Sequence, residues 1–160
     1  MTDFYIPAYQ DLAFRRTLLG DPETMSYNHA WGGTVSFEEE QWKEWYDHWI
    51  IHHEGKRFYR YVIDEHGSFA GEAAYHYDAA NEMFIADVII YAPFRNRGLG
   101  SEALELLSKA AAEHGIEDLY DTIAADNPAL SMFLKHGFVI VSRTDEIITV
   151  KRDLKRGCNE

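Results

Sequence analysis

The residues best suited to chemistry form a short run at 95–100, with the sequence RNRGLG. Glycine at 98 and 100 would let an anion approach the backbone with no Cβ in the way. Arg95 and Arg97 add positive charge beside it. Where such a turn opens a helix, the first N–H groups have no helical partner and the positive end of the helix dipole faces outward. The run therefore predicts a binding site for a pyrophosphate group.

The flanking sequence supplies the elements that this site needs. Residues 83–91 are apolar, β-branched and aromatic, which is typical of a mostly buried strand. Residues 99–115 repeat apolar side chains at helical spacing, with Glu105 and Lys109 placed for an ion pair on the opposite face. The site thus belongs to a strand–turn–helix unit.

A dinucleotide-binding fold is one fold that contains such a strand–turn–helix unit. Gly98, Gly100 and Ala103 fit the G-x-G-x-x-G/A fingerprint, and Asp121 lies about 20 residues on, where the ribose-binding acid is expected. That fold, however, places the fingerprint in its first strand–helix turn and adds a second nucleotide-binding half. Only about 60 residues follow the turn here, which disfavours an NAD(P)-dependent oxidoreductase.

Two sequence motifs favour a different family of proteins. Arg95, Gly98 and Gly100 occupy the three defining positions of the Arg/Gln-x-x-Gly-x-Gly/Ala loop of the GNAT superfamily of N-acetyltransferases. The segment 126–138 resembles the second motif of this superfamily, in which an Asn and a short helix precede a Gly-Phe pair. Asn127 is a good helix cap, and Gly137 suits the left-handed residue that ends a helix. The chain therefore resembles this superfamily, in particular its ribosomal-protein and small-amine branch.

The resemblance implies a fold and a donor. The fold would be α/β (α+β), a single domain over 1–160 with a mixed, mostly antiparallel sheet flanked by helices. Acetyl-CoA would be the acyl donor, with its pantetheine arm along the strand at 88–90 and its pyrophosphate on the N–H groups of 96–101. The implied donor-binding residues are Val88, Ile89, Ile90, Arg95, Asn96, Arg97, Gly98, Leu99, Gly100, Ser101, Asn127 and Phe133.

Acetyl transfer also requires a base that takes a proton from the amine. Glu72 is the first candidate, because it follows Gly71 in a Gly-Glu step that resembles one found in this branch. Asp87 is the second, because a carboxylate inside an apolar strand is costly unless it is paired or functional. His76 is a third option. Phe133 stands where many members carry a tyrosine as general acid, and it has no hydroxyl to donate.

The acceptor is implied to be the primary amine of a small molecule or of a protein N-terminus. In the superfamily, the first helices and the loop after them shape the acceptor pocket. The corresponding residues here are Tyr27, Asn28 and Trp31, together with Glu72. A non-catalytic module that binds or senses acyl-CoA is the alternative, and the missing tyrosine makes it plausible.

The aromatic and histidine residues of the second predicted helix have a structural interpretation. Trp42, Trp45 and Trp49 share one helical face, which favours core packing over a cation-binding cage. His48 and His52 are spaced for a metal, but no third ligand is in register, so we expect no metal.

The patterns predict strands at 4–9, 57–63, 69–77, 83–91, 119–124, 138–143 and 147–152, and helices at 11–19, 36–51, 99–115 and 128–136. Ser36, with Glu39 three residues later, is predicted to cap the second of these helices. Pairing of the terminal strands could produce a homodimer, as in other superfamily members.

Composition limits the class of protein. The net charge of −12 disfavours nucleic-acid binding. No apolar run is long enough for a membrane helix, and the N-terminus lacks the pattern of a secretion signal. Cys158 is the single cysteine and cannot form an internal disulfide. We therefore expect a cytoplasmic protein without membrane or nucleic-acid partners.

Overall fold

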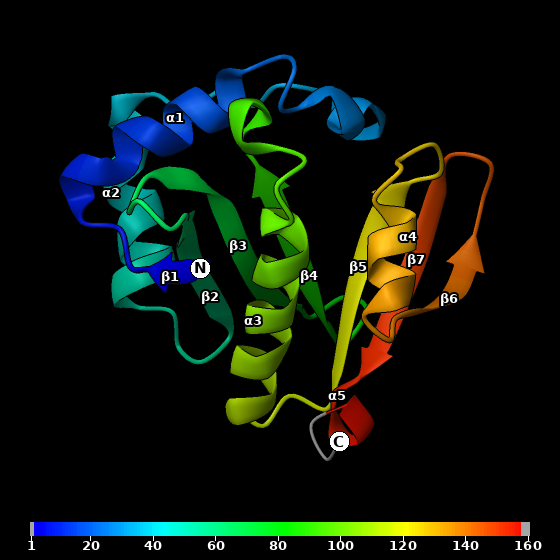
Figure 1. Ribbon diagram of the computed structural model, residues 1–160. Helices are drawn as coiled ribbons and strands as arrows, with labels where there is room; N and C mark the ends of the chain where they lie inside the picture. The colour runs from blue at the N-terminus through cyan, green and yellow to red at the C-terminus, as the bar shows by residue number, and fades with distance from the viewer. Residues whose placement is uncertain (1, 158–160) are drawn as a thin grey trace.

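The computed structural model describes residues 2–157, which form one seven-stranded sheet in the order β1-β2-β3-β4-β5-β7-β6 (Figure 1). Neighbouring strands are antiparallel except β4 and β5, which are parallel. The predicted mixed, mostly antiparallel sheet is confirmed. Cys158, the single cysteine, lies outside the described residues. The strands are β1 (Asp3–Tyr5), β2 (Arg57–Ile63), β3 (Phe69–Asp78), β4 (Met83–Ile90), β5 (Asp118–Ala124), β6 (Val139–Arg143) and β7 (Ile147–Asp153).

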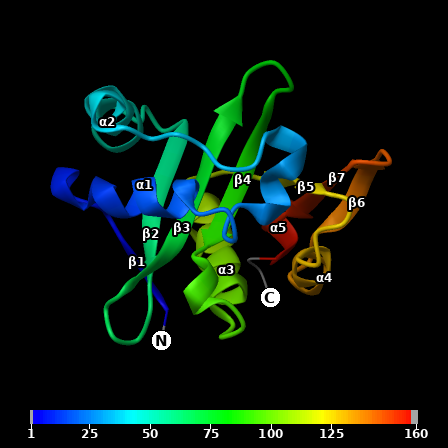
Figure 2. The ribbon, with the colours of Figure 1, turned by 90° about the horizontal axis from the view of Figure 1, so that it is seen from above.

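Helices cover both faces of this sheet. Seen from above, α3 and α4 lie on one face and α2 on the other (Figure 2). No helix of the described residues is long and apolar enough to cross a membrane. The helices are α1 (Leu12–Gly20), α2 (Glu39–Tyr46), α3 (Leu99–Glu113), α4 (Leu130–Lys135) and α5 (Leu154–Gly157), with short helical turns η1 (Tyr9–Asp11), η2 (Ser26–Trp31), η3 (Asp47–Ile51) and η4 (Ala92–Phe94).

Each face has its own core. On the α3 face, Leu104 and Leu107 are fully buried against a cluster that includes Val62 of β2 and Leu119 of β5. On the other face, α1 and α2 share a cluster that includes Trp42. The burial of Trp42 supports core packing as the role of the tryptophan face of this helix. The buried side chains of α3 pack this helix against the sheet.

β4 and β5 pair over only a short length. Their register joins Phe84 to Leu119 and Ile85 to Tyr120, and no pairing continues beyond these residues in the described chain. β4 pairs with β3 along its whole length, from Met83 to Ile90. The edge of β4 that faces β5 therefore keeps unpaired N–H and C=O groups between 86 and 90. Figure 1 shows the two strands diverging towards the end of the sheet under η2.

Three predicted elements differ from the structure. The strand predicted at 4–9 is only Asp3–Tyr5, and Tyr9 belongs to the helical turn η1. The helix predicted from Ser36 begins at Glu39, because Glu38 is the N-cap and its N–H donates to Gln41 Oε1 at 2.8 Å. The predicted cap at Ser36 is therefore wrong, and beyond Tyr46 the helix continues as the π turn η3. The segment Ser26–Trp31, predicted as loop, forms the helical turn η2.

Candidate active site

A cavity of about 700 Å³ opens where β4 and β5 separate. The loop before α3, together with α4 and η2, completes its walls. Its volume is in the range of small-molecule sites. Arg97 and the third candidate base, His76, do not line it, and His76 packs against Trp49 instead. The other predicted site residues do line it: Tyr27, Asn28, Trp31, Glu72, Asp87, Val88, Ile89, Ile90, Arg95, Asn96, Gly98, Leu99, Gly100, Ser101, Asn127 and Phe133.

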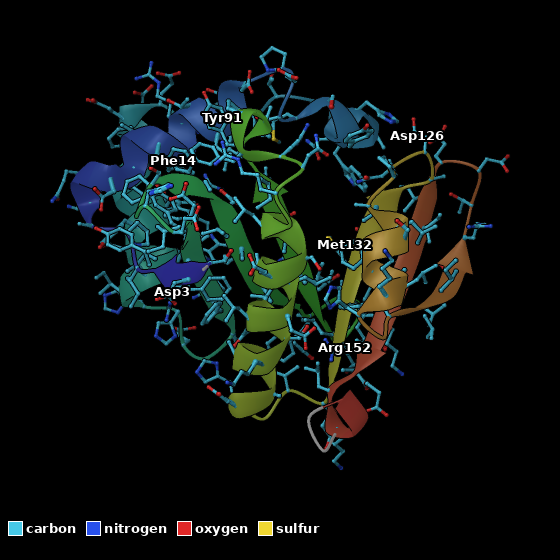
Figure 3. The ribbon with its side chains drawn as sticks, in the orientation of Figure 1. Asp3, Phe14, Tyr91, Asp126, Met132 and Arg152 are labelled. Carbon is cyan, nitrogen blue, oxygen red and sulfur yellow. The ribbon has the colours of Figure 1, made fainter. Side chains whose placement is uncertain are left out.

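The loop before α3 has the backbone geometry of an anion site. Asn96 and Gly98 adopt the left-handed region, with φ of 66° and 79°. Glu102 N–H makes the first bond of the helix, to Gly98 O, so the N–H groups of 99–101 precede it and have no helical acceptor. A Cβ at Gly100 would lie 3.5 Å from Met132 Sδ, in ordinary contact. Met132 projects from α4 towards α3 (Figure 3).

The two arginines of the loop have different surroundings. The Arg95 guanidinium donates to Thr24 O at 2.6 Å and to Glu23 O at 3.2 Å, which ties the loop to the turn before η2. Arg97 lies outside the cavity lining, 3.9 Å from Asp64 Oδ2. Arg95 therefore borders the cavity while its side chain also holds the loop, and Arg97 contributes charge from further away.

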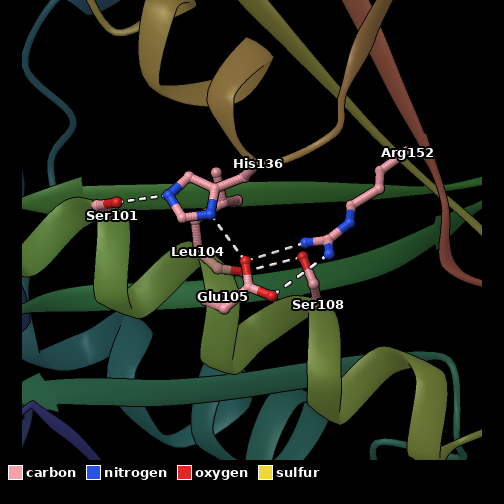
Figure 4. A network of polar contacts seen from close by, with 6 residues as sticks. All are labelled: Ser101, Leu104, Glu105, Ser108, His136 and Arg152. Carbon is pink, nitrogen blue, oxygen red and sulfur yellow. Dashed lines mark hydrogen bonds and ion pairs between the residues drawn. The ribbon is translucent and has the colours of Figure 1, made fainter. Parts of the chain in front are cut away.

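A polar network fastens the first turn of α3 to the second motif (Figure 4). Ser101 Oγ lies in hydrogen-bond contact with His136 Nε2. His136 Nδ1 lies 2.8 Å from Glu105 Oε2, and Arg152 of β7 donates to both oxygens of Glu105. Gly137, next in the chain, has the predicted left-handed conformation, with φ of 84°. The Gly-Phe motif thus supports the anion loop through side chains as well as through packing.

η2 is joined to the loop that follows β5. His29 Nε2 lies 3.0 Å from Asp126 Oδ1, and this contact lowers the pKa of the Asp126 carboxyl. Asp126 stands at the tip of its loop (Figure 3). Asn127 is not the cap of α4, because the helix begins at Leu130 with Ala129 as its N-cap. Asn127 Oδ1 instead accepts the N–H of Ala129 at 2.9 Å, in the turn before the helix. η2 therefore covers part of the cavity and is fastened to the loop that follows β5.

The first predicted base, Glu72, is already engaged. Its side chain is 3% exposed, and Tyr59 Oη donates to its Oε1 at 2.8 Å. Arg15 Nε forms an ion pair with the same oxygen at 3.3 Å. Both partners hold the Glu72 carboxylate from within the protein, on the side of the cavity that α1 covers.

The second predicted base, Asp87, is open to the cavity. The residue is exposed, but that exposure is to the cavity space, and protein surrounds the carboxyl group. This enclosure raises the pKa of Asp87 from 3.8 to about 7, with a further contribution from the Glu72 charge. Asp121 of β5 also lines the cavity and is buried, and burial together with the charge of Asp87 raises its pKa well above the ordinary value.

The sequence did not identify three residues that lie in or beside the carboxylate part of this cavity: Asp121, Arg15 and Tyr59. Asp121, considered only as a ribose ligand, was detectable as a carboxylate in an apolar strand. Arg15 of α1 and Tyr59 of β2 offered no local signal, because both reach Glu72 only through the packing of α1 and β2 against β3.

Phe133 lies at the expected border between core and cavity. It is buried, lines the cavity, and packs edge-on against Phe138 with ring centroids 5.2 Å apart. Its apolar ring offers no proton to a leaving group from this side of the cavity.

Comparison with known proteins agrees with the geometry. Residues 21–138 match the model of the acetyltransferase (GNAT) family. The spermidine N-acetyltransferase from Vibrio cholerae, solved with CoA and spermine, superposes with a TM-score of 0.79 at 18% identity, over 99% of this chain and 98% of that one. An N-acetyltransferase from Staphylococcus aureus Mu50 gives 0.74 at 16% identity, over 96% and 99%.

A third structure, an N-acetyltransferase from Thermoplasma acidophilum solved with coenzyme A, gives a TM-score of 0.70 at 11% identity, over 96% of this chain and 99% of that one. A search of curated proteins finds no match. The family match spans most of the chain, and the sheet, the anion loop and the separated strands agree with it. The chain therefore belongs to the acetyltransferase (GNAT) family.

Proposed function

We propose that this protein transfers the acetyl group of acetyl-CoA to the primary amine of a small molecule, with Asp87 as the base. One observation carries the proposal: the unpaired edge of β4 and the side chain of Asp87, which belongs to the same strand, both line one cavity. An extended molecule can pair with such an edge as an added strand would. The partial cover by η2 favours a small acceptor over a protein N-terminus.

Features of the cavity fit the donor from end to end. The N–H groups at the start of α3 suit a pyrophosphate. The unpaired backbone between 86 and 90 suits the amide groups of the pantetheine arm. V. cholerae and T. acidophilum relatives were solved with CoA, which supports the same ligand here.

The reaction then needs few groups from the protein. The ammonium group of the acceptor gives one proton to the Asp87 carboxylate, and the free amine nitrogen then forms a bond to the acetyl carbon. The carbon–sulfur bond breaks, and the nitrogen releases its second proton to solvent as the amide forms. The electron pair leaves with sulfur as the CoA thiolate, which is tolerable for an ordinary thiol with a pKa of about 8.5. A backbone N–H near Ile89 is suited to stabilise the carbonyl oxygen. No side-chain acid at Phe133 is required.

Two further expectations belong to this proposal. We propose the cytoplasm as the location, on the sequence argument above. We also propose a homodimer through the terminal strands, because β6 exposes Val139, Ile140 and Val141 at the end of the sheet. Light scattering after size exclusion would test the dimer.

Release of free CoA thiol tests the function directly. Purified protein with acetyl-CoA is screened against primary amines and N-terminal peptides. We expect turnover with small amines and little with peptides. Acetyl-CoA binding in calorimetry without turnover on any acceptor would instead support the sensing module, and binding of NAD(P) in place of CoA would support the dinucleotide reading.

A further inference from the structure

Arg15 of α1 brings a positive charge to the carboxylate side of the cavity. Its side chain is 16% exposed, and its guanidinium carbon lies 4.5 Å from the Phe37 ring centroid and 4.4 Å from that of Trp45. Tyr61 Oη accepts the Arg15 backbone N–H at 3.2 Å and donates to Asp11 O at 2.8 Å. The helix turn and the side chain are both held in place, so this guanidinium is positioned in advance of any ligand.

The Arg15 guanidinium has a buried donor, Nε, whose hydrogen bond the described residues do not satisfy. The Nε atom lies 3.3 Å from Glu72 Oε1, yet among the described residues it is the one buried side-chain nitrogen or oxygen with no hydrogen-bond partner. A guanidinium carries five N–H donors in a planar fork, and leaving buried donors unpaired is costly. Because Arg15 lines the cavity, a ligand can supply the acceptor.

The charges around Arg15 define which ligand fits. The Arg15 cation balances the Glu72 anion. Asp121 is buried, and burial together with the charge of Asp87 raises its pKa well above the ordinary value. Asp87 is the exposed carboxylate of the cavity, where it can pair with one ammonium group. A polyamine would place a second cation near Arg15, whereas a carboxylate matches the two-pronged guanidinium fork.

Resting on the proposed acetyltransferase function, we propose that the acceptor is an amino acid or a close analogue, with Arg15 binding its carboxylate while Asp87 faces its amine. The carboxylate takes no part in the bond changes described above. Its role is to hold the amine beside the base, so Arg15 sets substrate specificity.

Matched acceptor pairs test the substrate class with the unmodified protein. L-phenylalanine is compared with phenethylamine, L-leucine with isoamylamine and L-lysine with cadaverine, and spermidine is assayed beside them. For at least one pair, we expect kcat/KM for the amino acid to exceed that of its decarboxylated amine by at least about tenfold, equivalent to about 1.4 kcal/mol. If every decarboxylated amine, or spermidine, is used as well as the amino acids or better, the inference is overturned and the proposed function stands.

Variants separate recognition from structural damage. Arg15→Gln should raise KM for the amino acid and bring the ratio within a pair close to one, and Arg15→Lys should recover part of it. A defect in folding would lower both rates and leave the ratio unchanged. Arg16→Gln is the matched control, because Arg16 is half exposed and pairs with Glu38 on the surface.

The carboxylate site at Arg15 can be tested even if the protein acetylates none of the amines. If no amine releases CoA, the proposed function fails, and calorimetry with the CoA-saturated protein decides the rest. Binding of an amino acid by the unmodified protein but not by Arg15→Gln would still support a carboxylate site at Arg15. No binding, or equal binding by both proteins, would overturn it.

Discussion

Replacing Asp87 with Asn should remove activity and increase stability in a pH-dependent way. The substitution keeps the size of the side chain and removes its charge and basicity. With a pKa of about 7, Asp87 is about one-tenth ionised one pH unit below that value. In the unmodified protein, kcat/KM should therefore rise about tenfold per pH unit up to a break near 7. The Asn variant should lose about 10²- to 10⁴-fold in rate, and the break should disappear.

The stability change has a defined sign. Between its ordinary pKa of 3.8 and about 7, Asp87 holds its proton in the folded protein and loses it in the unfolded chain. The unfolded state thus binds fewer protons, and stability falls as the pH rises through this window. Without acetyl-CoA, Asp87→Asn should raise Tm at about pH 8 and leave it nearly unchanged at about pH 4.

These two measurements can refute the reasoning separately. A rate break near 7 that persists in the Asn variant would remove Asp87 from the role of base. An equal or lower Tm at the higher pH would show that the folded protein stabilises the Asp87 anion. Asp118→Asn, on the partly exposed start of β5, is the control and should keep both the break and the rate.

Substitutions at four other positions test the geometry. Gly71→Ala places a Cβ 2.2 Å from Ile89 O, so it should destabilise the β3–β4 pair by about 1–3 kcal/mol in urea unfolding, and unchanged stability would contradict the register. Gly100→Val should weaken acetyl-CoA binding at least about tenfold in calorimetry while the fold survives; full affinity would refute the anion loop. Ser101→Ala should weaken the same binding by about two- to tenfold, and no change would remove its hydroxyl from the site. Phe133→Tyr should retain activity and Phe133→Leu should lose it only in part, since this ring fills space; complete loss in a folded Leu variant would show a further role.

The motif segments were predictable because their signals are local. Gly98 and Gly137 have the positive φ expected of them, and the Asn127 side chain bonds the backbone of the turn before α4, although Ala129 is the N-cap. Such features depend on one turn of chain, which sequence patterns describe directly. The same reasoning failed at Ser36, because Glu38 two residues later makes the competing cap with Gln41.

The choice of base depended on contacts that the sequence does not display. Glu72 was the first candidate because it follows Gly71 in a Gly-Glu step, but Arg15 and Tyr59 approach it from elements 57 and 13 positions away in the chain. Likewise, Asp87 and Asp121 influence one another only because β4 and β5 are neighbouring strands whose pairing ends just before these residues. Sequence patterns give the face of a strand that a side chain occupies, and not the partners that cross from other elements.

The free edge of β4 also bears on how the protein avoids aggregation. An apolar, unpaired strand edge is a template on which another polypeptide can form a sheet. Here the edge lies inside a cavity walled by β5, α4 and η2, rather than on the outer rim of the sheet. A strand that belongs to another folded sheet brings its neighbours with it and does not fit between these walls, whereas a single extended ligand does. The recess that admits the ligand thus shields this edge from other protein molecules.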